Sequence, residues 1–163
     1  MLFRSVFHEN LGETQSLGAL TIVEADAGLI FGGADDEVSG SGSTGPVSLI
    51  NTDGAIDFGS QEVIGGAGIV LNGGSLLSTL TIQTTGDALR FNGAVTLASH
   101  VVLDTDATDA DDQGGVITFT SDAFLNSAAG EHNNFTLDAG LASITFNANL
   151  GEKVALGNFT VSE

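Results

Sequence analysis

Five aspartates crowd one short stretch of the chain, DTDATDADD, which a glycine pair follows shortly after. They are Asp104, Asp106, Asp109, Asp111 and Asp112. Ca²⁺ takes six to eight oxygen ligands and favours closely spaced carboxylates, so these five are candidate calcium ligands. The spacing is not that of an EF-hand loop, because Asp109 replaces the glycine at position six and Gly115 the glutamate at position twelve. A solvated acidic corner loop is the alternative interpretation, and the same pair of interpretations applies to Asp35-Asp36-Glu37.

The three histidines, His8, His100 and His132, are not spaced for metal binding or catalysis. None belongs to an HxxxH or HxH pair, and the chain has no cysteine to complete a zinc or redox site. No GxSxG elbow presents a serine nucleophile. The glycine-rich runs FGG and IGGAGIVLNGG lack the lysine of a phosphate-binding loop and indicate turns and corners. We therefore predict no catalytic and no cofactor-binding residues.

Polysaccharide cleavage is the main enzymatic alternative. Glycosidases need paired carboxylates at a set separation, and lyases need a basic residue near bound Ca²⁺. The chain has only three basic side chains, Arg4, Arg90 and Lys153, and only Arg90 lies mid-chain, at an outward-facing strand position. We expect a protein that is not an enzyme. A carbohydrate-binding or polysaccharide-degrading β-helix is the alternative function.

Short β-strands are the elements that would position these residues. The 23 glycines, the single proline and the many β-branched residues are typical of strands joined by tight turns. Apolar triplets recur as LTI (20–22), VSL (47–49), LTI (80–82), VVL (101–103), FTL (135–137) and FTV (159–161). After each of the first five comes a second strand that ends in Phe, in GLIF, AIDF, ALRF, VITF and SITF.

The spacing of these strands predicts an all-β parallel β-helix, or β-solenoid, of about five to six rungs. The centre of the triplet and the following Phe are ten residues apart in four of the five cases. The triplets follow one another at 27, 33, 21, 34 and 24 residues, which is the size of one solenoid turn. We expect a ladder of buried rings, one from each rung, at Phe31, Phe58, Phe91, Phe119 and Phe146.

A longer repeat is superimposed on the rungs. FHENLGETQSLGALTIVE, residues 7–24, recurs as FNANLGEKVALGNFTVSE, residues 146–163, with nine identities in eighteen positions at an offset of 139. The rung spacings also add up to 139, so one super-repeat is expected to span five rungs. The sequence thus predicts a single solenoid segment over 1–163.

These repeat motifs resemble the β-strand-repeat regions of giant bacterial surface proteins, which are filamentous-haemagglutinin-like or adhesin-like. The resemblance rests on ITF-N-x-x-LG-x-x-x-x-LG-x-x-TV and on TDADDQGGVITFTSDAFLNSAAGEHNNFTLDAG. It implies export to the extracellular space or the bacterial cell surface and a role in a stalk, adhesin or filament. The start of the chain, MLFRSVFHEN, lacks a signal-peptide core, so we expect any export signal to lie outside this sequence.

The charge of the chain limits its partners. A net charge of −18 repels phosphate backbones, so nucleic-acid binding is not expected. The sequence contains no run of 18 apolar residues, so no membrane-spanning helix is predicted. The edges of a solenoid carry unpaired backbone groups, so the expected partners are other copies or adjacent repeats, head to tail.

Overall fold

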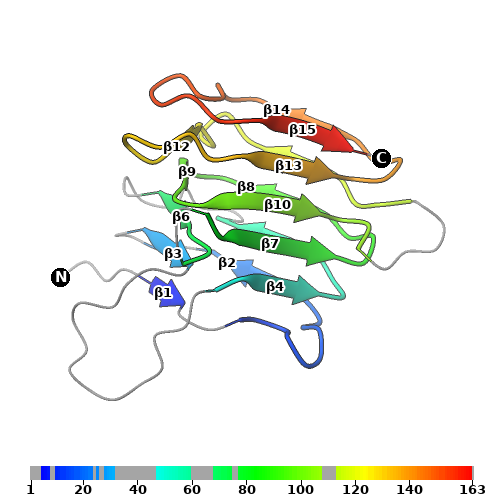
Figure 1. Ribbon diagram of the computed structural model, residues 1–163. Helices are drawn as coiled ribbons and strands as arrows, with labels where there is room; N and C mark the ends of the chain where they lie inside the picture. Colours follow the sequence, from blue (N-terminus) through cyan, green and yellow to red (C-terminus); the bar gives the residue numbers. More distant parts are fainter. Residues whose placement is uncertain are drawn as a thin grey trace, which may run out of the picture.

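The structure is a computed structural model that describes residues 5–7, 10–23, 25, 28–31, 47–59, 68–74, 77–107 and 113–162. Within these residues the chain forms fifteen short strands and no helix. The strands stack side by side in three five-stranded parallel sheets (Figure 1). The all-β parallel solenoid predicted from the sequence is confirmed.

We refer to the three sheets as faces 1, 2 and 3. Face 1 consists of β1 (Ser5–Phe7), β3 (Leu29–Phe31), β6 (Ile69–Leu71), β9 (Val95–Leu97) and β12 (Leu125–Ser127). Face 2 consists of β4 (Leu49–Thr52), β7 (Thr79–Thr84), β10 (His100–Asp104), β13 (Phe135–Asp138) and β15 (Phe159–Ser162). Face 3 consists of β2 (Leu20–Ile22), β5 (Ile56–Phe58), β8 (Leu89–Phe91), β11 (Ile117–Phe119) and β14 (Ile144–Phe146).

The chain visits the faces in the order 1, 2, 3 and then begins the next turn. In the first turn, face 2 is occupied by residues 11–17, where Leu11 and Leu17 bridge to β4. In the sixth turn, face 1 is occupied by the segment around Leu150, which bridges to Leu125 of β12. The described stack therefore has five complete turns and two faces of a sixth, in agreement with the expected number of rungs.

Side chains alternate between inward and outward positions along each strand, and the inward ones fill the interior. In β5, for example, Ile56 and Phe58 are fully buried, whereas Asp57 between them is partly exposed. The inward pairs expected for the five Phe-ending strands are buried in four of these strands and half-buried in the fifth. They are Leu29 and Phe31, Ile56 and Phe58, Leu89 and Phe91, Ile117 and Phe119, and Ile144 and Phe146. The strand pattern read from the sequence is confirmed.

The phenylalanine rings form one column through the stack. Consecutive rings from Phe7 through Phe31, Phe58, Phe91 and Phe119 to Phe146 have centroids between 4.7 and 5.3 Å apart. Aromatic contacts of this kind contribute about 0.5–1.5 kcal/mol per pair beyond burial. The predicted column of stacked rings is confirmed, but the expectation of one buried ring from each rung on one face is wrong. Phe31 on face 1 and Phe58 on face 3 belong to the same turn, and Phe146 is half-buried.

A second column, of threonines, lines the corner between faces 2 and 3. Thr52, Thr84 and Thr105 are fully buried at equivalent positions of successive turns. Each hydroxyl donates to a carbonyl of its own corner, on Gly54 (2.5 Å), Asp87 (2.6 Å) and Gly115 (2.7 Å). A buried hydroxyl is costly without such a partner, so this column fixes the shape of the corner.

Two further expectations about the rungs are wrong. Leu20–Ile22 was expected to stack in one sheet with the other apolar triplets, which lie on face 2. Instead it lies on face 3, where Thr21 pairs with Asp57. The super-repeat also does not span five turns, as shown below. The cause is a third strand in each turn, on face 1, which strand spacing alone did not reveal: β6, β9 and β12 are only three residues long and lack a closing Phe.

The expected register of the triplet at 47–49 is wrong by one residue. Thr81 pairs with Leu49, not with Ser48, so Ile50, and not Leu49, is the buried apolar residue of β4. The Oδ1 atom of Asn10 accepts hydrogen bonds from the backbone N–H groups of both Ser48 (2.7 Å) and Leu49 (3.1 Å). Successive N–H groups of a regular strand point in opposite directions, so this shared acceptor interrupts the alternation just before β4.

Candidate functional site

The acidic stretch lies at the end of β10. Asp104 is the last residue of that strand, and its Oδ1 atom accepts a hydrogen bond from the backbone N–H of Asp106 (2.9 Å). Asp109, Asp111 and Asp112 lie outside the described residues. Within the described part of the chain, no group of three or more histidine or acidic side chains is placed to hold a metal ion. The calcium interpretation stays a prediction.

Asp104 has a carboxylate neighbour in the next turn. It pairs with Asp138 of β13 on the outer surface of face 2. Burial raises the pKa of Asp104 above its usual value, and the negative charges of Asp138 and Asp106 add to this, while the hydrogen bond from Asp106 opposes it. Two like charges directly opposite each other destabilise a sheet, so this pair is a cost to the fold.

The two described histidines connect neighbouring turns. The backbone N–H of Asn134 donates to Nδ1 of His100 (3.1 Å), and Nδ1 of His132 lies 3.2 Å from the carbonyl oxygen of Ala155. His8, Asp35, Asp36 and Glu37 lie outside the described residues. His100 and His132 therefore link neighbouring turns.

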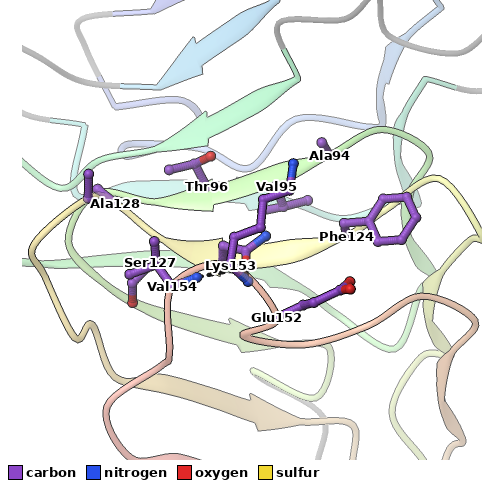
Figure 2. Close-up of a pocket in the computed structure, with 11 residues that line it drawn as sticks. Ala94, Val95, Thr96, Phe124, Ser127, Ala128, Glu152, Lys153 and Val154 are labelled. Carbon is purple, nitrogen blue, oxygen red and sulfur yellow. Dashed lines mark hydrogen bonds between the residues drawn. The ribbon is translucent and has the colours of Figure 1, made fainter.

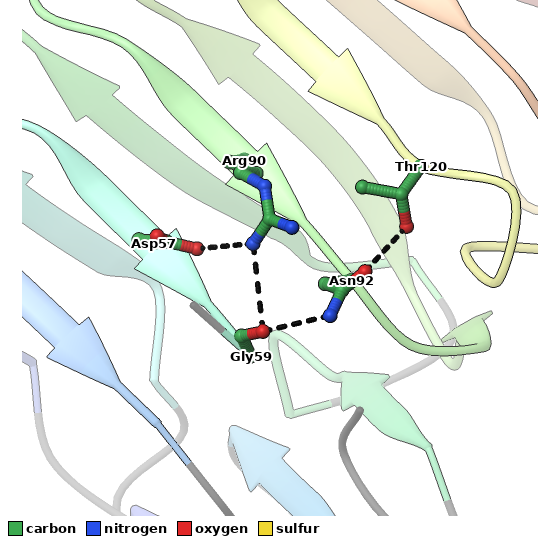
Figure 3. A network of polar contacts seen from close by, with 5 residues as sticks. All are labelled: Asp57, Gly59, Arg90, Asn92 and Thr120. Carbon is green, nitrogen blue, oxygen red and sulfur yellow. Dashed lines mark hydrogen bonds and ion pairs between the residues drawn. The ribbon is translucent and has the colours of Figure 1, made fainter. Parts of the chain in front are cut away.

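Arg90 makes an ion pair between two turns of face 3. Its Nη1 atom lies 2.9 Å from Oδ1 of Asp57 and 3.4 Å from the carbonyl oxygen of Gly59. That carbonyl also accepts from Nδ2 of Asn92 (2.8 Å), and the Oγ1 of Thr120 donates to Asn92 (2.8 Å), so three turns are connected (Figure 3). The outward position predicted for Arg90 is confirmed, and its guanidinium braces the stack.

A pocket of about 390 Å³ lies on the outer surface of face 1. Its floor is β9 and β12, and residues 152–154 of the last turn close one side (Figure 2). Asn126 holds this segment, because its Oδ1 accepts from the backbone N–H groups of Lys153 (2.8 Å) and Val154 (3.3 Å). Glu152 projects on the side of the exposed Phe124 ring, and Lys153 reaches toward β9 (Figure 2).

The sequence interpretation missed this pocket. Its charged residues, Glu152 and Lys153, follow the first LG of the recurring LG-x-x-x-x-LG motif. Glu152 is shared with the first copy, which has Glu13, whereas Lys153 stands where the first copy has Thr14. The signal in the sequence was that one of only three basic residues stands there. Phe124 gave no signal, because strand alternation places it outside the ring column.

The two copies of the recurring motif form the two terminal turns of the described stack. In the first copy, Gly12 lies under the second turn, and a Cβ atom there would come within 2.1 Å of the Asn51 carbonyl oxygen. In the second copy, Gly157 of the sixth turn packs against the fifth turn, and a Cβ there would come within 2.5 Å of the His132 carbonyl oxygen. The first glycine of the motif thus faces the next turn, and the second faces the preceding one.

The counterparts of these glycines lie in open space. A Cβ on Gly18, the counterpart of Gly157, would meet no atom of the described residues within 4 Å. A Cβ on Gly151, the counterpart of Gly12, would meet nothing closer than 3.4 Å, and only residues of its own turn. Each terminal turn therefore uses one of its two glycines for close packing, whereas the motif as a whole is suited to a turn on both sides.

The upper edge of the last turn exposes part of the apolar interior. Phe159 is 44% exposed and Val161 55%, whereas Phe135 and Leu137, which precede them in the stack, are fully buried. β15, which carries Phe159 and Val161, is the end strand of face 2 at this end of the stack (Figure 1). An exposed apolar patch at an unpaired strand edge is a typical contact surface.

The fold defines this chain as a three-sided parallel β-solenoid. Comparisons with protein-family models, with characterised proteins and with solved structures find no match. Among the described residues there is no helix of the length and apolarity that crossing a membrane requires.

Proposed function

We propose that this chain is a structural repeat segment of an extracellular or cell-surface filament, stalk or adhesin, whose successive units stack end to end. The observation that carries the proposal is the continuous stack of three sheets with a single column of rings from Phe7 to Phe146. Solenoid turns contact only their neighbours, so such a stack extends in one dimension without changing its cross-section.

The chemistry of the surface supports a non-catalytic role. Arg90, the one mid-chain base, is engaged with Asp57 on face 3, away from the pocket on face 1. The net charge of −18 keeps the sides of neighbouring solenoids apart, whereas the apolar edge favours contact at the ends. The resemblance of the repeat motifs to bacterial surface proteins supports export and an adhesive or filamentous setting.

Electron microscopy of chains with one, two and three units tests this proposal. Because residues 146–163 replace 7–24 of the next unit, each added unit consists of residues 25–163. We expect straight rods of constant width whose length increases by the same amount with each unit. Separate particles joined by flexible connections would overturn the proposal. Sedimentation of the single unit over a range of concentrations shows whether units also associate without a covalent link.

Carbohydrate binding is a second candidate, supported by the pocket on face 1. The exposed Phe124 ring lies beside Glu152 and the polar side chains of Thr96 and Asn126. An aromatic ring with a few convergent polar groups is suited to the apolar face and hydroxyls of a sugar. Glycan-array binding that is lost in Phe124→Ala and kept in Leu141→Ala, another exposed apolar residue, would support it, whereas no binding by the unaltered chain would refute it.

A further inference from the structure

The two copies of the motif lie on different faces of the solenoid. In the first copy, Phe7 is on face 1, residues 11–17 are on face 2 and β2 is on face 3. In the second copy, Phe146 is on face 3, the segment around Leu150 is on face 1 and β15 is on face 2. The sequence therefore recurs after four turns and two faces, not after a whole number of turns.

The contacts between the first and second turns show what fits on the last turn. The Phe7 ring stacks on Phe31 at 5.2 Å and 15°, Asn10 accepts from two amides before β4, and Gly12 lies under the carbonyl of Asn51. The counterparts of these three residues are Phe146, Asn149 and Gly151. All three lie in the last two described turns. The Nδ2 atom of Asn149 donates to Oε2 of Glu152 in its own turn (2.9 Å).

We propose that the next unit of the same sequence stacks on this edge rotated by one face, so that its second turn covers the last turn of the unit before it. Its Phe31 then lies on Phe146, its Ser48 and Leu49 amides donate to Asn149, and its β5 pairs with β15. This inference rests on the proposed function, because it specifies how successive units join. Each unit is turned by one third of a revolution, and a surface feature such as the face 1 pocket returns to the same side only after three units.

The rotation accounts for both open glycines. Gly151 receives the Asn51 carbonyl of the following unit, as Gly12 receives it within this chain. Gly18 has no positive φ angle and no close neighbour among the described residues, so none of the described residues requires a glycine there. Its counterpart Gly157 needs glycine because of His132 in the turn below, and Gly18 meets the same carbonyl when a preceding unit lies beneath it.

Cysteine pairs in a two-unit chain, residues 1–163 followed directly by 25–163, test the rotation. Thr160→Cys in the first unit is combined with one cysteine in the second unit, one for each face. Thr21 is the counterpart of Thr160 and pairs with Asp57, so the one-face rotation places Asp57→Cys beside it. Stacking without rotation places Leu49→Cys there, because Leu49, Thr81, Val102, Thr136 and Thr160 follow one another on face 2. Stacking with a rotation by two faces places Ile30→Cys there, because β3 would then pair with β15.

The expected result is a disulfide with Asp57→Cys alone, since neighbouring strands lie about 4.8 Å apart and disulfides span that distance. The chain contains no cysteine, so the background is clean. Thr21→Cys with Asp57→Cys in the single unit is the positive control. A disulfide with Leu49→Cys or Ile30→Cys would overturn the rotation and leave the proposed function standing. No disulfide with any of the three, in the presence of a positive control, would refute end-to-end stacking itself.

A second measurement does not depend on disulfide formation. Gly151→Ala, placed in the first unit, is compared in the one-unit and two-unit chains. In both, the φ angle of 65° makes alanine unfavourable, but only in the two-unit chain would its Cβ meet a carbonyl. We expect Gly151→Ala to lower the melting temperature by a further ~2–4 °C or more in the two-unit chain, the shift for roughly 1 kcal/mol in a domain of this size. An equal loss in both chains would count against the rotated contact.

Discussion

The first and the last turn are built from the same motif, but their neighbours differ. The first turn is covered by the second, and its Gly12 lies against a carbonyl there. The last turn has its partner only below, and its Phe159 and Val161 are about half exposed. Because the local sequence is shared, the difference in burial comes from the position in the stack. The comparison teaches that this motif encodes two contact surfaces, one for each adjacent turn.

The largest effect is expected from breaking the ring column in its closed part. Phe91 is fully buried between Phe58 and Phe119, whereas Phe159 at the open edge is 44% exposed. Phe91→Ala should destabilise the fold by about 3–5 kcal/mol through loss of burial and a cavity. Phe159→Ala should cost less than half as much. Urea unfolding of both variants checks this, and equal losses would contradict a closed core with an open edge.

Alanine at the two equivalent glycines sharpens the comparison. Gly157→Ala should cost about 1–3 kcal/mol, because its Cβ would approach the His132 carbonyl and force the backbone apart. Gly18→Ala should change stability by no more than about 0.5 kcal/mol in the single unit, as at an ordinary surface position. Both are measured by denaturant unfolding at the same pH and salt concentration. A cost at Gly18 as large as that at Gly157 would show that its local environment has been misjudged.

The ion pair between Arg90 and Asp57 should contribute less. Both side chains are about one third exposed, and pairs of this kind contribute roughly 0.2–1 kcal/mol. Arg90→Gln should therefore lower the free energy of unfolding by about that amount at low salt, and by less in concentrated NaCl. Lys153→Gln controls for the loss of one positive charge. A loss that does not depend on salt would indicate that packing of the Arg90 side chain matters more than its charge.

An effect of similar size but opposite sign is expected at Asp104, whose pKa is raised by burial and by the neighbouring carboxylates. The folded chain keeps a proton on Asp104 at pH values where the unfolded chain has lost it, so this residue lowers stability as the pH rises through that range. Asp104→Asn should stabilise the fold at pH 7 by about 0.2–1 kcal/mol, the size of a cross-strand pair effect. The gain should vanish below the ordinary value of 3.8. Asp122→Asn, an exposed carboxylate on a turn, is the matched control, and an equal gain there would point to net charge alone.

The sequence predicted the strands that end in a phenylalanine. A terminal Phe identified β3, β5, β8, β11 and β14, together with their inward residues, and a fixed distance from an apolar triplet supported all of them except β11. The face 1 strands β6, β9 and β12 were missed, because three residues between corners carry too few alternations to be distinguished from a turn. Without them the corners could not be counted, and β2 was assigned to the wrong face.

The candidate site was less predictable than the fold. The acidic stretch was found from its composition, and of its five aspartates Asp104 and Asp106 are among the described residues. The pocket depends on Phe124 and on a segment that begins 28 residues later in the sequence, at Glu152, and meets it only because the next turn stacks on the one before. Similarly, the recurrence at 139 residues was visible, but its rotation depends on the number of faces per turn, which only the topology provides.

The central claim is that the last turn is an open copy of the first and closes when another unit follows. Amide hydrogen exchange of β15 (Phe159–Ser162) in the one-unit and two-unit chains tests it most directly, because half of the amides of an edge strand lack a ladder partner. We predict that the β15 amides directed away from β13 exchange rapidly in the single unit and become as protected as those of β10 in the two-unit chain. Equal and rapid exchange of these amides in both chains would contradict the claim.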